Sequence, residues 1–187
     1  MHDLGWTQLT PIQELAIPPF RAGRDLFVQA QTGTGKTAAF GLPLLERIDR
    51  PAGAPFALII VPTRELAAQV AGDLTALGRH RSARVVALYG GVGYRPQEDA
   101  LRRGAHIVAA TPGRVLDLAK RRTLDLSRIR TLILDEADRL LDLGFAPDIA
   151  RIVALLAGQR QTALFSATLT AEVRTIVGGR DLEEVTL

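Results

Sequence analysis

Short apolar runs alternate along the chain with segments whose apolar residues recur every three or four positions. The apolar runs predict strands. The recurrence of apolar residues in the other segments is typical of amphipathic helices. The run at 56–61 is apolar throughout, which is typical of a strand buried on both faces. The expected strands cover residues 25–30, 56–61, 84–88, 106–110, 131–134, 161–165 and, at the end of the chain, 184–187.

The expected helices lie before the first strand and in several of the segments between strands. The first should end at the pair Pro18-Pro19, because proline lacks the amide hydrogen that continues a helix. Strands that alternate with helices predict an α/β fold with a mainly parallel sheet of about seven strands and helices on both faces. No repeat or linker divides the chain, so we expect a single domain over residues 1–187. The expected helices cover 12–17, 37–46, a stretch from 62–66 to about 77, the region of 97–101, and residues from about 170 onward.

Six of the strands end directly in a polar or glycine-bearing cluster. Parallel strands bring their carboxyl ends to one edge, and ligands of open α/β sheets bind beyond those ends. We therefore expect all six clusters to lie together at one edge, although they span residues 30 to 168. This edge is the predicted active face.

The first cluster, Ala30 to Thr37, has the pattern of a phosphate-binding loop between a strand and a helix. Its glycines let backbone N–H groups converge on an anion. Lys36 can reach the β- and γ-phosphates, and the Thr37 hydroxyl can ligate Mg²⁺. Ala30 replaces the usual first glycine. The alternative, a glycine-rich turn with an incidental lysine, is disfavoured by the flanking strand and helix. The expected nucleotide-binding residues here are Thr32, Gly33, Thr34, Gly35, Lys36 and Thr37.

A second cluster, Asp135 to Asp138, supplies carboxylates directly after a buried strand. Asp135 suits a magnesium ligand, and Glu136 can orient or deprotonate an attacking water. The alternative is a charged turn in which Asp138 caps a helix, and the phosphate loop makes this less favoured. Ser166 and Thr168, after the sixth strand, could hydrogen-bond Asp138 and its neighbours.

The remaining clusters carry backbone N–H groups, a hydroxyl and guanidinium groups. They are too far in sequence from Lys36 to be assumed to share its phosphates. A second polyanion, a nucleic-acid backbone, is the economical interpretation, although each cluster taken alone is more often a turn. The clusters are Arg64, Gly90-Gly91, and Thr111 to Arg114.

Composition narrows the class of protein. The chain has 187 residues, 47% hydrophobic and 23% charged, as expected of a globular protein. It contains no cysteine, and no apolar run approaches the ~18 residues that span a membrane, which fits a cytoplasmic protein. The three histidines are scattered, so a metal cluster is not expected. The net charge is only +3, yet 21 of the 23 basic residues are arginine, a side chain suited to phosphate recognition.

Taken together, these motifs resemble those of the DEAD-box RNA helicases, specifically their first RecA-like domain. The resemblance runs from Gly5 to Thr168, and the DEAD tetrapeptide alone would not be specific. In this family Ala-x-x-Gly-x-Gly-Lys-Thr is the usual form of the loop, so Ala30 is no anomaly. The matching segments, in the family's order, are 10–13, 30–37, 62–66, 90–91 with Gln97, 111–114, 135–138 and 166–168.

The resemblance implies a role for each motif. Gln13 would read the adenine edge and select ATP, while Lys36 and Thr37 hold phosphate and Mg²⁺, with Asp135 as metal holder and Glu136 as water activator. Asp138, Ser166 and Thr168 would couple the ATP state to RNA handling. The helix after Gly113 would bend one RNA strand and so open a duplex locally. The residues implied in sequence-independent RNA binding are Arg64, Gly90, Gly91, Gln97, Thr111, Gly113 and Arg114.

Two parts of the family pattern are missing from this chain. The aromatic that stacks on adenine normally lies farther upstream of Gln13, and the second RecA-like domain supplies arginine fingers worth ~10³–10⁵ in rate. We therefore expect a monomeric fragment of a longer helicase that binds ATP weakly and hydrolyses it very slowly alone. Two alternatives remain, a DNA-directed P-loop translocase and a non-catalytic nucleotide- or RNA-binding module. A kinase or GTPase is least favoured.

Overall fold

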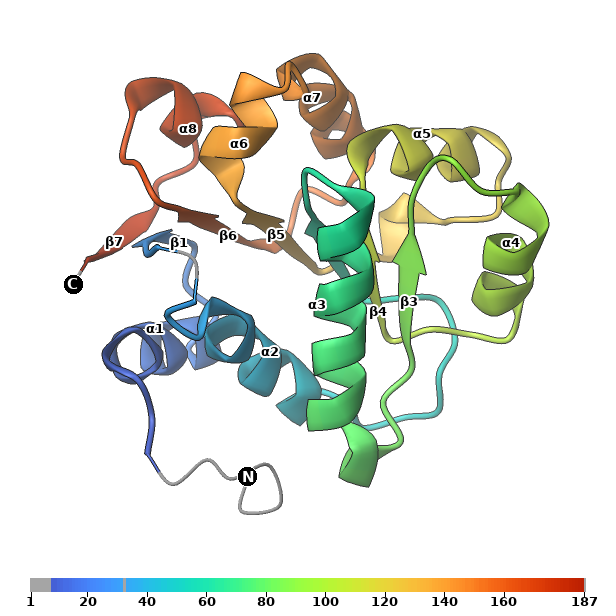
Figure 1. The fold of residues 1–187 in the computed structure, drawn as a ribbon, viewed down its shortest axis with the longest axis horizontal. Helices are drawn as coiled ribbons and strands as arrows, with labels where there is room; N and C mark the ends of the chain where they lie inside the picture. The colour runs from blue at the N-terminus through green and yellow to red at the C-terminus, as the bar shows by residue number, and fades with distance from the viewer. Residues whose placement is uncertain (1–7, 32, 187) are drawn as a thin grey trace.

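The computed structural model describes residues 8–31 and 33–186, which form one seven-stranded sheet with helices on both faces (Figure 1). Every strand pair is parallel, and the strand order is β3-β4-β2-β5-β6-β1-β7. The predicted α/β fold is confirmed. The strands are β1 Leu26–Gln29, β2 Ala57–Ile60, β3 Val85–Leu88, β4 Ile107–Ala110, β5 Thr131–Asp135, β6 Gln161–Ser166 and β7 Glu183–Thr186.

The sheet separates two hydrophobic cores. Helices α1 to α3 pack on one face around Phe40 and Phe165, whose rings meet edge to face with centroids 5.1 Å apart. Helices α5 to α8 cover the other face, around Leu132 and Leu164. The helices are α1 Pro11–Arg21, α2 Lys36–Glu46, α3 Arg64–Leu77, α4 Tyr94–Arg102, α5 Pro112–Lys120, α6 Ala137–Asp142, α7 Ala146–Leu155 and α8 Ala171–Thr175.

The expected stop of the first helix at Pro18-Pro19 is wrong. Helix α1 continues through both prolines to Arg21. The prolines lack the amide hydrogens that would bond the carbonyls of Glu14 and Leu15. Both of these residues are exposed, so water can bond their carbonyls instead. The residue after the prolines, Phe20, is fully buried, and its carbonyl oxygen accepts from the Arg47 and Gln161 side chains. Tertiary packing therefore keeps the last turn helical.

Helices α6 and α7 are absent from the predicted elements. The spacing of Ile149, Ile152 and Leu156, all buried, together with Pro147 in the first turn, is the signal that could have revealed α7. Helix α6 has only six residues and too little periodicity to be recognised.

The register of the sheet places the strand ends level with one another. Ile60 of β2 lies opposite Ala110 of β4 and opposite Leu134 of β5. Leu88 of β3 also pairs with Ala110, and at the other side of the sheet Gln29 of β1 pairs with Ser166 of β6. The polar clusters that follow these residues therefore meet at one edge, as the sequence predicts.

Candidate nucleotide and nucleic-acid sites

The phosphate loop turns through two glycines in the left-handed region. Gly33 has φ 82°, and Gly35, the residue before α2, has φ 90°. Residues with a side chain rarely adopt this backbone conformation, and a Cβ on Gly35 would also lie 2.4 Å from Gln13 Nε2. Lys36 is the first residue of α2, so the loop delivers the helix N-terminus to the edge of the sheet. The predicted contact of Thr32 lies outside the described residues.

Gln13 supports the phosphate loop through hydrogen bonds of its side chain. Its side chain is almost fully buried, with Oε1 accepting from the Thr10 amide at 3.0 Å and Nε2 donating to the Gly35 carbonyl at 3.1 Å. The Thr10 hydroxyl donates to the Thr34 carbonyl at 2.9 Å. The bonds to Thr34 and Gly35 fix the N-terminus of α1 against the loop, and the bond between Thr10 and Gln13 orients the Gln13 side chain. The predicted contact between Gln13 and adenine stays a prediction.

Lys36 and Asp135 form a buried ion pair at the centre of the site. Lys36 Nζ lies 3.6 Å from Asp135 Oδ1, and the two side chains are only 8% and 5% exposed. Burial raises the pKa of Asp135 above its ordinary value, and the positive charge of Lys36 opposes that rise. A bound phosphate would compete with Asp135 for Lys36.

A cleft of about 470 Å³ opens beside this pair. The phosphate loop and the end of β5 form one side, and helix α3 forms the other. The α3 residues were not predicted as part of the site, although they recur every three or four positions along one face of the helix. Burial raises the pKa of Asp73, one of them. The lining residues from α3 are Leu66, Gln69, Asp73, Ala76 and Leu77.

The oxygen donors beside the cleft suit Mg²⁺. The Thr37 hydroxyl makes no hydrogen bond to any described residue, and the carboxylates of Asp135 and Glu136 lie at the adjoining strand end. Glu136 Oε2 accepts from Arg139 at 3.2 Å. Mg²⁺ prefers hard oxygen ligands and is commonly completed by substrate phosphate and water. No group of three His, Asp or Glu among the described residues could hold a metal, so bound phosphate and water would have to supply further ligands.

The end of β6 is tied to the start of α6. Asp138 Oδ2 accepts from the amides of Ala167 and Thr168 at 3.1 and 3.2 Å and from the Thr168 hydroxyl at 3.4 Å. In the other direction the Asp138 amide donates to Ser166 Oγ at 3.3 Å. The hydrogen bonds predicted between these residues are present. Glu136, the second residue of the Asp135–Asp138 motif, has φ 53°, a strained value for a residue with a side chain.

Farther along the edge, Arg64 and Gly91 lie side by side. A Cβ on Gly91 would lie 3.6 Å from an Arg64 guanidinium nitrogen. The Arg64 side chain is 63% exposed and pairs with Glu65 at 2.6 Å. Gly113 is exposed as well, with open space beside it, and the Thr111 hydroxyl makes no hydrogen bond to a described residue. These groups form a surface that a polyanion can reach.

Gln97 and Arg114 face inward instead. Gln97 is hydrogen-bonded to both the amide and the carbonyl of Tyr89, at 3.3 and 3.0 Å. Arg114 donates to Gln97 Oε1 at 3.1 Å and to the Val92 carbonyl at 2.8 Å, and its guanidinium lies 4.3 Å from the ring centre of Tyr94. Both side chains therefore hold the glycine loop that follows β3, and neither offers its polar groups to the surface.

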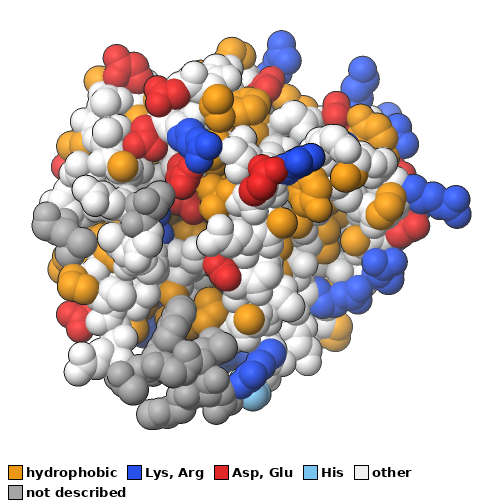
Figure 2. Space-filling view, viewed as in Figure 1, with side chains coloured by type: hydrophobic (Ala, Val, Ile, Leu, Met, Phe, Trp, Pro, Cys, Tyr) orange, Lys and Arg blue, Asp and Glu red, His pale blue; other side chains and the backbone are white. Residues whose placement is uncertain are grey.

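The charge distribution on the visible face is uneven. In Figure 2 the Lys and Arg side chains project mainly along the right-hand margin, around α4, and acidic side chains gather at the upper left, around α8. None of the helices in the described part of the chain is long and apolar enough to cross a lipid bilayer.

The fold and the phosphate loop define a P-loop domain, a class of domain that typically binds nucleoside triphosphates. Residues 10–176 match the family described as DEAD/DEAH box helicase, and the chain belongs to that family. It is 51% identical over 177 residues to the ATP-dependent RNA helicase DeaD of Escherichia coli, covering 94% of this chain and 28% of that protein. It is also 51% identical over 176 residues to the DEAD-box ATP-dependent RNA helicase CshA of Streptococcus pneumoniae, covering 94% of this chain and 34% of that protein.

A solved structure has the same fold as this chain. The crystal structure of a hypothetical ATP-dependent RNA helicase from Sulfolobus tokodaii superposes with a TM-score of 0.91 at 38% sequence identity. The match covers 100% of this chain and 55% of that one. The chain thus spans about half of the solved relative and about a third of the curated relatives.

Proposed function

We propose that this chain is the ATP-binding half of an ATP-dependent RNA helicase, which couples binding and hydrolysis of Mg-ATP to RNA binding and local duplex opening. The observation that supports the proposal most strongly is the buried Lys36–Asp135 pair beside a cleft at the same sheet edge as the exposed Arg64–Gly91 surface. One edge thereby combines groups for triphosphate chemistry with groups for a second polyanion. The relatives at about half identity carry the name of that activity.

The chain's own residues divide the hydrolytic step between them. Lys36 and the loop amides bind the β- and γ-phosphates, with the adenine directed towards Gln13. Glu136 accepts a proton from water as the water oxygen bonds to the γ-phosphorus, and the bond to the β-phosphate oxygen breaks to release ADP. Thr37 and Asp135 would hold Mg²⁺, which neutralises charge that develops on the phosphate oxygens.

The exposed groups along the edge would bind RNA through its sugar-phosphate backbone, without reading sequence. Arg64, the glycine loop and the N-terminal turn of α5 make the direct contacts, whereas Gln97 and Arg114 position that loop. Asp138, Ser166 and Thr168 would transmit the nucleotide state between the two sites. The parent protein would be cytoplasmic and would supply a second RecA-like domain with arginine fingers.

The test compares Mg-ATP turnover by this chain with turnover by the same chain joined to its downstream domain. Each form is measured with and without single-stranded RNA. We expect RNA-stimulated hydrolysis in the longer form only. Glu136→Gln in the longer form should reduce turnover by about 10² or more while ATP still binds. Unchanged turnover would favour a non-catalytic module. Equal stimulation by matched DNA would favour a DNA-directed translocase, and equal RNA-independent turnover in both forms would contradict the half-site.

A further inference from the structure

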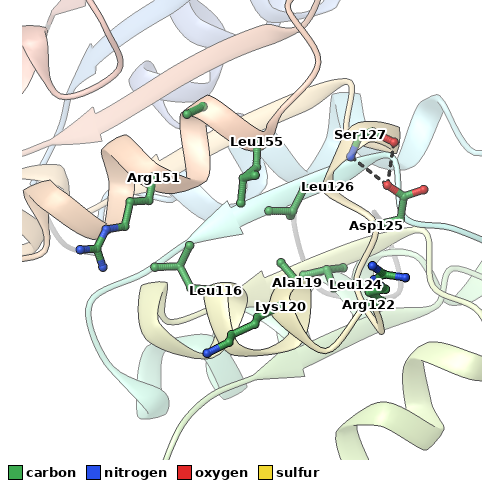
Figure 3. Close-up of a pocket in the computed structure, with 11 residues that line it drawn as sticks. Leu116, Ala119, Lys120, Arg122, Leu124, Asp125, Leu126, Ser127, Arg151 and Leu155 are labelled. Atoms are coloured by element: carbon green, nitrogen blue, oxygen red, sulfur yellow. Dashed lines mark hydrogen bonds between the residues drawn. The ribbon is translucent and has the colours of Figure 1, made fainter.

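A groove of about 930 Å³ lies between α5 and α7, away from the nucleotide cleft and outside every motif of the sequence (Figure 3). Leu116 comes from α5, Leu126 from the 3₁₀ helix Leu126–Arg128 and Leu155 from α7, and they point towards one another across the groove. Leu126 is almost fully buried and belongs to the floor, whereas Leu155 is 52% exposed. The groove is therefore an apolar surface open to solvent.

The rim of the groove is cationic. Lys120 and Arg122 are exposed and form no ion pair with a described residue, and Arg151 stands at the other end, 3.7 Å from Asp148. The acidic lining residue, Asp125, accepts from the Ser127 amide and hydroxyl and lies 3.8 Å from Arg128, so it is paired in the same way as Arg151. The unpaired charge around the leucines is therefore that of Lys120 and Arg122, and it is positive.

We propose that this groove docks an amphipathic helix of a partner protein, with leucine-like anchors on one face and acidic side chains flanking them. An apolar floor suits anchors at helical spacing, and the cationic rim complements acidic flanks. The groove lies between two helices and has no sheet edge to which a peptide strand could be added. Among its lining residues there is no aromatic side chain on which a nucleic-acid base could stack.

Titration with a synthetic peptide tests the proposal. The probe is an amphipathic peptide of about 18 residues with leucine at helical spacing and glutamate flanking it, long enough to form a helix once bound. The matched probe carries lysine at every glutamate position. We expect saturable binding of the acidic peptide, measured by fluorescence anisotropy, with at least about tenfold weaker binding of the lysine peptide.

Variants of the chain locate the binding surface. Leu155→Asp, and separately Arg122→Glu with Arg151→Glu, should each weaken the acidic peptide at least about tenfold. Leu143→Asp, at a leucine of similar exposure (53%), and Arg95→Glu, at an exposed arginine outside the groove, should leave the affinity unchanged. Circular dichroism melting confirms that each variant is folded.

Several results would overturn the proposal. These are no saturable binding, equal binding of both peptides, or equal effects of groove and control variants. A loss of single-stranded RNA binding in the Arg122→Glu and Arg151→Glu variant, with peptide affinity unchanged, would assign the rim to nucleic acid. A dimer that Leu155→Asp dissociates would assign the groove to a second copy of the chain.

Discussion

At the scale of single residues, the Lys36–Asp135 pair links stability to the chemistry of the site. Lys36→Met would leave the Asp135 carboxylate buried without its cation, which costs about 3 kcal/mol for buried pairs of this kind. The pKa of Asp135 is already raised by burial, and loss of the cation would raise it further. We expect a lower free energy of unfolding at neutral pH, measured by urea titration.

The pH dependence of this loss of stability follows from the direction in which the pKa of Asp135 is shifted. A carboxyl whose pKa is higher in the folded than in the unfolded state stabilises the fold below its unfolded pKa and loses that stabilisation as pH rises towards the folded pKa. The deficit of Lys36→Met should therefore be smaller at pH 4 than at pH 7. Asp135→Asn added to Lys36→Met should recover part of it at pH 7. A pH-independent deficit would show that the charge pair is not its cause.

Gly35 offers a second prediction at this scale, with Gly23 as its matched control. Both have positive φ, at 90° and 79°, so Gly→Ala strains either by about 1 kcal/mol. Only at Gly35 would the new Cβ meet another side chain, Gln13 Nε2 at 2.4 Å, whereas nothing lies within 4 Å at Gly23. Calorimetric titration with ATP should show at least tenfold weaker binding for Gly35→Ala and unchanged binding for Gly23→Ala. Equal ATP affinities of the two variants would show that Gln13 does not support the loop.

At the scale of elements, sequence patterns predicted all seven strands to within about one residue. The apolar runs of the inner strands were clear because their residues fill the two hydrophobic cores, whereas β7 contributes only Val185 to them. The motifs were placed correctly because parallel strands bring their ends to one edge. The end of α1 was missed because burial of Phe20, a long-range effect, outweighs the local effect of two prolines. The inward orientation of Arg114 was missed for a similar reason, since its partners lie on a loop and on a different helix.

The network around Arg114 predicts how two elements act together. Gln97 on α4 and Arg114 on α5 share one hydrogen bond and both hold the loop after β3. Arg114→Ala and Gln97→Ala should each weaken RNA binding about tenfold through that loop, and the double variant should be little worse than either. Amide hydrogen exchange of 90–93 should accelerate in each. Additive losses with unchanged exchange would instead indicate independent contacts with RNA.

At the scale of the whole molecule, the two hydrophobic cores share one sheet, but the strands of that sheet are not equally buried. Strands β2 and β5 lie inside the sheet, are buried along their full length and contribute to both cores. Strand β7 is an edge strand with only Val185 buried, and the neighbouring helix α8 has five residues. Arg64 of the proposed RNA surface follows β2, and Asp135 of the proposed nucleotide site ends β5, so both lie at the ends of buried inner strands, whereas Gly91 follows β3, the other edge strand.

Hydrogen exchange can test this ranking. Amides of β2 and β5 should exchange only through global unfolding, so their opening free energy should equal the free energy of unfolding measured with urea. Amides of β7 and α8 should exchange through local opening, at lower free energy and with little dependence on urea. Ile133→Val in β5 should lower protection in β2 and β5 together, by about 1 kcal/mol, and leave the local opening of β7 unchanged. Equal protection across the sheet would mean that the chain opens as one cooperative unit from edge to edge.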